Sequence, residues 1–221
     1  MSDATQPAGG VHDGPSRGPQ GSRAADPPAF PDPVSSQILR RACDSTGTVL
    51  AALRPADLDR PTPCASWTVR DVVNHVLGGA GFFAELAETG TVADGDEDPD
   101  FTAGDFNGTF RNQASRLVAA FNAPGAMDKM MAMPIGELPG SVCVWIAAGD
   151  IFTHGWDLAK ATGRPTDLEP ELAAALLARI TPLLPDSMRG PDGQAPFGPR
   201  VEVPESAPPA DRLAAFEGRH P

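Results

Sequence analysis

Two histidines and one aspartate are the side chains of this sequence whose types and spacing best suit chemistry. Of the four histidines, His12 and His220 stand near the chain ends, whereas His75 and His154 fall inside apolar segments of helical period. A buried imidazole costs free energy unless it is hydrogen-bonded or bound to a ligand. Asp150 precedes His154 by four residues. The two side chains are therefore expected on one helix face, about 5–6 Å apart at Cβ.

His75, Asp150 and His154 form a candidate metal-ligating set. If a facing helix supplies His75, the three side chains offer two nitrogens and one oxygen to a divalent cation. Three protein ligands leave coordination positions open, as catalytic zinc sites do. From spacing alone the simpler interpretation is a buried Asp150–His154 ion pair beside a separately hydrogen-bonded His75, because D-x-x-x-H is common by chance.

Cys64 and Asp157 are weaker candidates for a catalytic role. Cys64 is interpreted either as a further metal ligand or redox thiol, or more simply as a small buried hydrophobic side chain. Asp157 follows His154 by three residues, so it is a candidate to orient an imidazole or act as a base. A helix-capping or surface ion-pair role fits Asp157 equally well. The tryptophans are predicted core residues: Trp67, Trp145 and Trp156.

The elements that must position these residues are helices. Apolar periodicity predicts helices over 34–54, 67–88, 102–122, 139–162 and 168–181. Thr68-x-x-Asp71 has capping-box form, and Gly163 stands where the fourth helix should end. The segment MDKMMAMPIGELPG predicts an irregular hairpin or extended crossover, and the last 25 residues predict a short strand and a short helix. The fold class is all-α, a four-helix bundle with a short extended crossover and C-terminal additions.

Composition and charge limit the classes of protein that fit. Residues 1–33 are rich in Gly, Pro, Ser and Asp and are predicted to be a disordered N-terminal extension, which leaves 34–221 as one domain. The net charge of −12 disfavours a nucleic-acid partner. No apolar run reaches the roughly 18 residues of a membrane span. Three scattered cysteines without a CxxC motif indicate a reducing compartment, so we expect a cytoplasmic protein.

Three stretches of the chain resemble a known family. The mycothiol-dependent maleylpyruvate isomerase N-terminal family, a branch of the DinB-like superfamily, has a second-helix signature similar to PTPCASWTVRDVVNHVLGG. Its fourth-helix signature is similar to DIFTHGWDLAKATGRP. The ending, FGPRVEVPESAPPADRLAAFEGRHP, resembles a compact actinobacterial branch known only as metal-binding. The resemblance covers roughly residues 36–221.

The resemblance implies a DinB-like bundle with a metal, usually Zn²⁺, near one end of its core. It assigns the metal ligands to His75, Asp150 and His154. The isomerases carry Glu where this chain has Asp150, so the carboxylate here is one methylene shorter. The shorter side chain is expected to affect where the metal lies and which metal binds best, but it does not remove a ligand.

The function implied by the resemblance is thiol chemistry. An open zinc position would hold a low-molecular-weight thiol, mycothiol in this family, as a thiolate that attacks a small electrophilic substrate. The chain is expected to lack the separate C-terminal domain of those isomerases, which favours a thiol transferase over the isomerase. The alternatives are metal-dependent hydrolysis, a non-catalytic metal or small-molecule binding protein, and a natural-product cyclase that uses the bundle cavity. The protein is expected to be a monomer or a homodimer.

Overall fold

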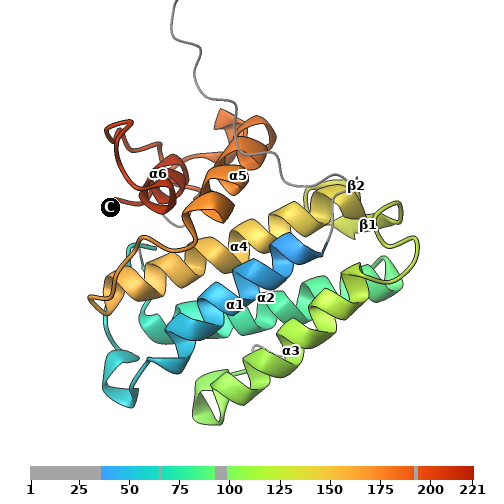
Figure 1. Cartoon of the computed structure of the whole chain (residues 1–221), viewed down its shortest axis with the longest axis horizontal. Helices are drawn as coiled ribbons and strands as arrows, with labels where there is room; N and C mark the ends of the chain where they lie inside the picture. Colours follow the sequence, from blue (N-terminus) through green and yellow to red (C-terminus); the bar gives the residue numbers. More distant parts are fainter. Residues whose placement is uncertain (1–35, 65, 93–98, 192–193) are drawn as a thin grey trace, which may run out of the picture.

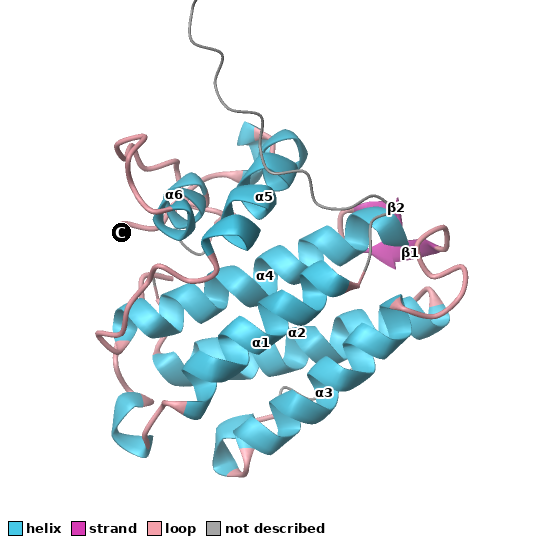
Figure 2. Ribbon diagram, viewed as in Figure 1, coloured by secondary structure: helices cyan, strands magenta, loops and turns pink. Residues whose placement is uncertain are grey.

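The chain is mostly helical over the residues that the computed structural model describes, namely 36–64, 66–92, 99–191 and 194–221 (Figure 1 and Figure 2). In this part of the chain the helices are α1 (Gln37–Ala51), α2 (Val69–Thr89), α3 (Phe106–Phe121), α4 (Gly140–Ala161), α5 (Pro170–Ile180) and α6 (Pro209–Phe216). The antiparallel strands β1 (Met130–Met133) and β2 (Gly136–Pro139) lie between α3 and α4. The predicted helical class is confirmed, and the predicted extended crossover is this hairpin.

Helix α4 lies at the centre of the helical packing. It contacts α1 and α2 on one side and α5 and α6 on the other, while α2 also packs against α3 (Figure 1). Its side chains are buried around most of the helix, from Cys143 to Ala159. A helix that is apolar on nearly every face must be surrounded in this way. Polar side chains on α4 therefore lie inside the protein.

The helix that carries His75 starts and ends at residues with clear local causes. Thr68 is the N-cap of α2, and its side chain accepts a hydrogen bond from the backbone of Asp71 while the Asp71 carboxylate accepts one from Thr68 N at 2.7 Å. The helix ends at Gly90, whose φ of 88° is unstrained only without a Cβ. The predicted capping box is confirmed. At the end of α4, Gly163 takes a φ of 70°, as its predicted place after the helix requires.

Two predictions about the chain ends had different outcomes. The short strand predicted near the C-terminus is wrong, because residues 197–203 contain only an isolated bridge between Arg189 and Phe197. Prolines at 196, 199 and 204 remove the backbone donors that a strand needs there. The predicted extension at 1–33 lies outside the described residues.

Helices α1 and α4 approach closely where Gly155 faces Thr46. A Cβ on Gly155 would collide with Thr46 Oγ1 and would lie only 3.2 Å from Thr46 Cα. The Thr46 hydroxyl is itself fixed, because it donates a hydrogen bond to the carbonyl of Ile151 at 2.8 Å. The absence of a side chain at 155 thus allows α1 to lie against the segment of α4 that carries His154.

We predict that Gly155→Ala destabilises the protein by about 1–3 kcal/mol, since overpacking outweighs the roughly 1 kcal/mol gained in helix propensity. The matched control is Gly78→Ala on α2, where the nearest atom to the new Cβ is Phe101 Cε2 at 4.0 Å. That change should be neutral or stabilising. Urea unfolding measures both, and equal stabilisation by the two substitutions would contradict the close approach of α1 and α4.

Candidate metal centre

His75 from α2 meets Asp150 and His154 from α4 at the interface of the two helices. His75 Nε2 lies 3.2 Å from Asp150 Oδ1, and His154 Nε2 lies 3.7 Å from the same oxygen. The two imidazole centroids are 4.6 Å apart. One ligand atom from each of the three residues lies within 4.8 Å of the others. The structure thus brings together the three side chains that the sequence singled out.

The second oxygen of Asp150 is the feature that tests whether these residues fit a cation. Asp150 Oδ2 is buried and has no hydrogen-bond partner among the described residues. A buried carboxylate oxygen without a donor is costly, so native structures rarely keep one. Gly79 leaves room beside it, since a Cβ there would lie 3.3 Å from Oδ2. Two imidazole nitrogens and a carboxylate are a donor set that suits Zn²⁺, and these residues fit such an ion.

The charges of His75 and Asp150 stabilise each other. Burial alone would lower the pKa of His75, but the hydrogen bond and the charge of Asp150 raise it above its ordinary value. Burial alone would raise the pKa of Asp150, but the His75 hydrogen bond and the charge of His154 lower it. Asp150 is therefore available as an anionic ligand, and a metal at His75 Nε2 competes with the proton that the neighbouring carboxylate favours there.

Asp157 orients the imidazole of His154. The Nδ1–H of His154 donates to Asp157 Oδ2 at 3.0 Å, which leaves Nε2 on the side of Asp150. Asp157 is fully buried, so the surface ion-pair role considered for it is wrong. A carboxylate behind a histidine is the usual outer partner of an imidazole that ligates a metal.

Arg219, near the C-terminus, extends this chain of polar groups. Its Nη2 donates to Asp157 Oδ2 at 3.2 Å, and its Nη1 lies 3.7 Å from Glu217 Oε2. Burial would raise the pKa of Asp157, but the charge of Arg219 and the His154 hydrogen bond lower it. Sequence reasoning missed Arg219 and Glu217. In the sequence, these two charged residues simply flank Gly218 after an apolar helix. That pattern does not predict which part of the protein the C-terminal segment contacts.

Trp67 covers the two imidazoles from the loop before α2. Its ring stacks on His154 with centroids 5.6 Å apart and planes at 25°, and it lies 4.8 Å from the His75 ring at a tilt of 51°. Trp145 and Trp156 are buried in the core as predicted, whereas Trp67 is only partly buried and packs against the edge of the core. It forms a wall of the candidate centre.

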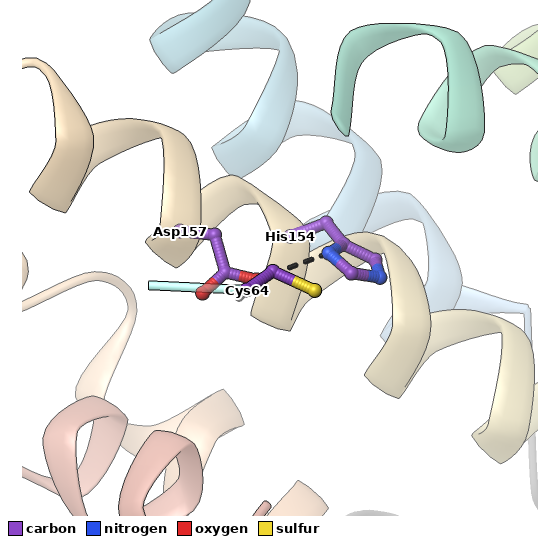
Figure 3. Close-up of side chains that lie close together, drawn as sticks. All are labelled: Cys64, His154 and Asp157. Atoms are coloured by element: carbon purple, nitrogen blue, oxygen red, sulfur yellow. Dashed lines mark hydrogen bonds and ion pairs between the residues drawn. The ribbon is translucent and has the colours of Figure 1, made fainter. Parts of the chain in front are cut away.

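Cys64, from the same loop, lies beside His154 and Asp157. Its sulfur points towards the imidazole (Figure 3) and is within 4.8 Å of a His154 nitrogen and an Asp157 oxygen. Arg219 Nη2 is 3.8 Å from the same sulfur. The simpler interpretation of Cys64 as a buried hydrophobic residue is wrong, because it is partly exposed and has polar neighbours. Its loop does reach the candidate centre.

Comparison with known proteins identifies the family. The family model described as the mycothiol maleylpyruvate isomerase N-terminal domain matches residues 39–159. The chain belongs to this family. Uncharacterized proteins from two strains of Mycobacterium tuberculosis are 39% identical over 190 residues, which cover 85% of this chain and 98% of theirs.

Solved structures share the fold of this family member. The mycothiol-dependent maleylpyruvate isomerase matches with a TM-score of 0.51 at 18% identity, and its alanine variant with 0.52 at 16%. Each match covers 66% of this chain and 68% of the isomerase chain, and at this identity it shows the fold alone. The family match includes His75, Asp150 and His154 but not Arg219. No described helix is both long and apolar enough to span a membrane.

Glu217 gives the candidate centre a pH-dependent neighbour. Burial raises its pKa to about 7, even though the charge of Arg219 opposes the shift. The unfolded chain thus releases this proton at lower pH than the folded chain does. The stability contributed by protonated Glu217 is complete below its ordinary pKa of 4.5 and is lost as the pH rises through about 7.

We predict that Glu217→Gln leaves stability nearly unchanged near pH 4.5 and raises it at about pH 8, by roughly 1.4 kcal/mol for each unit of pKa shift that it removes. Urea unfolding at both pH values measures the difference. The control is Glu202→Gln, an exposed position on the same C-terminal segment. A Glu217→Gln variant that is less stable than the wild type at high pH would show that the charged form is favoured instead.

Proposed function

We propose that this protein is a divalent-metal-dependent enzyme that acts on a small electrophilic metabolite with a low-molecular-weight thiol, mycothiol by family. His75, Asp150 and His154 hold the metal, most simply Zn²⁺. The observation that carries the proposal is the Asp150 carboxylate: its Oδ1 lies 3.2 and 3.7 Å from the two imidazoles, and its buried Oδ2 has no hydrogen-bond partner among the described residues. In this reading α1 to α4 form a DinB-like four-helix bundle, α5 and α6 are additions, and residues 34–221 are one domain.

The bound cation would supply Lewis acidity that keeps a coordinated thiol as a thiolate at neutral pH. The protein's own groups set up that chemistry. Asp157 accepts the Nδ1–H of His154 and so fixes the tautomer whose Nε2 faces Asp150. Arg219 keeps Asp157 ionised and in place. Trp67 packs on both imidazole rings and excludes water from that side.

The exposure of the ligands supports access by small molecules. The side chain of His75 is 38% exposed and that of Asp150 is 25% exposed, whereas His154 is only 8% exposed. A thiol and an electrophile can therefore approach from the His75 side. Attack of the thiolate sulfur on an electrophilic carbon of a substrate double bond breaks the π bond, and the carbanion that forms takes up the proton that the thiol released, which completes thiol transfer. If the sulfur is expelled again after rotation about the substrate bond, the result is a cis–trans isomerisation.

A second candidate is a non-catalytic protein that binds a metal or a small metabolite. The observation in its favour is that Asp157 and Glu217 are buried and pair with Arg219. Neither carboxylate is placed to exchange protons with solvent as a general base. Hydrolysis needs such a base to activate water, whereas thiolate chemistry does not. We therefore favour the transferase or isomerase class over a hydrolase.

Elemental analysis of the full chain, purified without a histidine tag, tests the metal site. We expect about one zinc per chain in the wild type and a loss of at least tenfold in affinity for His75→Ala, Asp150→Ala and His154→Ala, since a ligand contributes no less than its outer partner does. The matched control His220→Ala changes an exposed histidine and should retain the metal. Equal metal content in all four variants would contradict the proposed ligands, provided that circular dichroism shows each variant folded.

Thiol binding distinguishes the enzyme from the binding protein. We expect mycothiol to raise the melting temperature of the zinc-loaded chain but not of the metal-free chain, because only the loaded chain offers a site for sulfur. Turnover of an electrophile such as maleylpyruvate is then measured with and without the thiol. Zinc binding without any thiol-dependent shift would favour the binding protein, and a shift that also occurs without zinc would contradict coordination of the thiol.

A further inference from the structure

The guanidinium of Arg189, in the segment between α5 and α6, keeps two hydrogen-bond donors unused. Its side chain is only 6% exposed, yet its buried Nε and Nη2 have no hydrogen-bond partner among the described residues. A buried donor without an acceptor is costly, so native structures usually satisfy it. Nε and Nη2 form one edge of the guanidinium, which can donate side by side to two oxygens of one anion. The unused edge therefore indicates an oxyanion ligand.

Arg200 brings a second guanidinium to the same place. The Cζ atoms of Arg189 and Arg200 lie 4.6 and 4.7 Å from the centre of the Phe216 ring. Contact with an aromatic face stabilises each cation where it stands. Burial and the charge of Arg200 lower the pKa of Arg189, because the two positive charges repel each other. An anion bound to both arginines would offset that repulsion.

Backbone contacts anchor the two arginines beside the end of α6. Arg189 Nη1 donates a hydrogen bond to the carbonyl of Phe216 at 2.7 Å. The amide of Val201, next to Arg200, donates to the carbonyl of Ala215 at 2.9 Å. The Arg189 side chain is therefore ordered before a ligand arrives, which reduces the entropic cost of binding.

The exposed carboxylate of Asp186 is held only loosely by the two arginines. Its Oδ1 lies 3.7 Å from Arg189 Nε and 3.6 Å from Arg200 Nη2, which is too far for a hydrogen bond to either. The Asp186 side chain is 88% exposed, and such surface ion pairs contribute little. Glu217, whose charge also acts on Arg189, is paired with Arg219. A stronger oxyanion can therefore displace Asp186 and use the donors that it leaves unused.

We propose that Arg189 and Arg200 bind the phosphate group, or an equivalent tetrahedral oxyanion, of a small molecule. Two oxygens accept from Nε and Nη2 of Arg189 and a third accepts from Arg200, while Asp186 turns towards solvent. A carboxylate has only two oxygens, and the Arg189 edge uses both. A tetrahedral dianion thus suits the two guanidinia better. The site lies outside residues 39–159, which the family model matches, and it does not rest on the proposed function.

Isothermal titration calorimetry of the full chain with inorganic phosphate tests the site. Acetate is the comparison ligand, and the ionic strength is held constant. We expect saturable binding of a single phosphate, at least roughly tenfold tighter than acetate, because phosphate makes a further charge-assisted hydrogen bond to Arg200. No saturable phosphate binding, or acetate binding of equal affinity, overturns the proposal.

Two substitutions should change the phosphate affinity in opposite directions. Arg200→Gln, at a half-exposed side chain, should weaken binding by about tenfold. Asp186→Asn removes the competing carboxylate and should tighten binding several-fold. The controls Arg111→Gln and Asp128→Asn make the same changes in net charge at exposed positions and should have little effect. Effects as large in the controls would show a general response to net charge and overturn the site.

The donor of Arg189 can be observed directly by nitrogen–proton correlation NMR of the folded wild type. Its Nε–H signal, assigned through the side chain, should move downfield as phosphate is added and saturate with the affinity found by calorimetry. This measurement needs no substitution at Arg189, whose side chain also supports the end of α6. Phosphate binding that leaves the Arg189 signal unmoved would place the anion elsewhere and overturn the proposal.

Removal of metal separates this site from the candidate metal centre, since Zn²⁺ also binds oxygen ligands. The titration is repeated on chain that has been dialysed against EDTA and then freed of the chelator. We expect the same phosphate affinity with and without metal. Loss of phosphate binding on removal of metal would place the anion on the metal and overturn the arginine site, whereas failure of the metal site leaves the expected result unchanged.

Discussion

The Asp150 carboxylate lies between imidazoles that come from two different helices, and this contact constrains the structure around it. A partly buried anion is stable only with partners close enough to offset the cost of leaving water. His75 on α2 and His154 on α4 are those partners, at 3.2 and 3.7 Å from one oxygen. The register of α2 against α4 is therefore fixed at this point. The absence of a side chain at Gly79 and an Oδ2 that has no hydrogen-bond partner among the described residues are what a cation needs there.

The C-terminal segment completes this arrangement although it lies beyond the family match. Arg219 reaches Asp157 across 62 residues of sequence and is held in turn by Glu217. Gly218, with a φ of 93°, forms the turn between Glu217 and Arg219. It packs against the backbone of Gly198, which leaves no room for a Cβ on Gly218. The buried Arg219–Asp157 ion pair links the fold of the C-terminal segment to the orientation of His154. The stability of the protein and the candidate chemistry therefore depend on the same groups.

Much of the helical framework could be predicted from the sequence because its causes are local. Apolar periodicity placed α1 to α5 within a few residues, and the Thr68–Asp71 cap marked the start of α2. The candidate metal residues could be proposed because two histidines lay in apolar helices. The roles of Arg219 and Cys64 could not be predicted, because they depend on how distant loops fold back onto α4. Apolar periodicity carries no information about such contacts. The predicted C-terminal strand failed because its prolines outweigh its alternating pattern.

The most direct test of the central claim is X-ray absorption spectroscopy at the zinc edge on the metal-loaded chain without added thiol. Ligation by His75, Asp150 and His154 predicts a first shell of nitrogen and oxygen only, at about 2.0–2.2 Å, with the outer scattering of two imidazoles. A sulfur scatterer at about 2.3 Å would place the metal at Cys64 instead. That result, or the scattering of a single imidazole, would contradict a cation shared between α2 and α4.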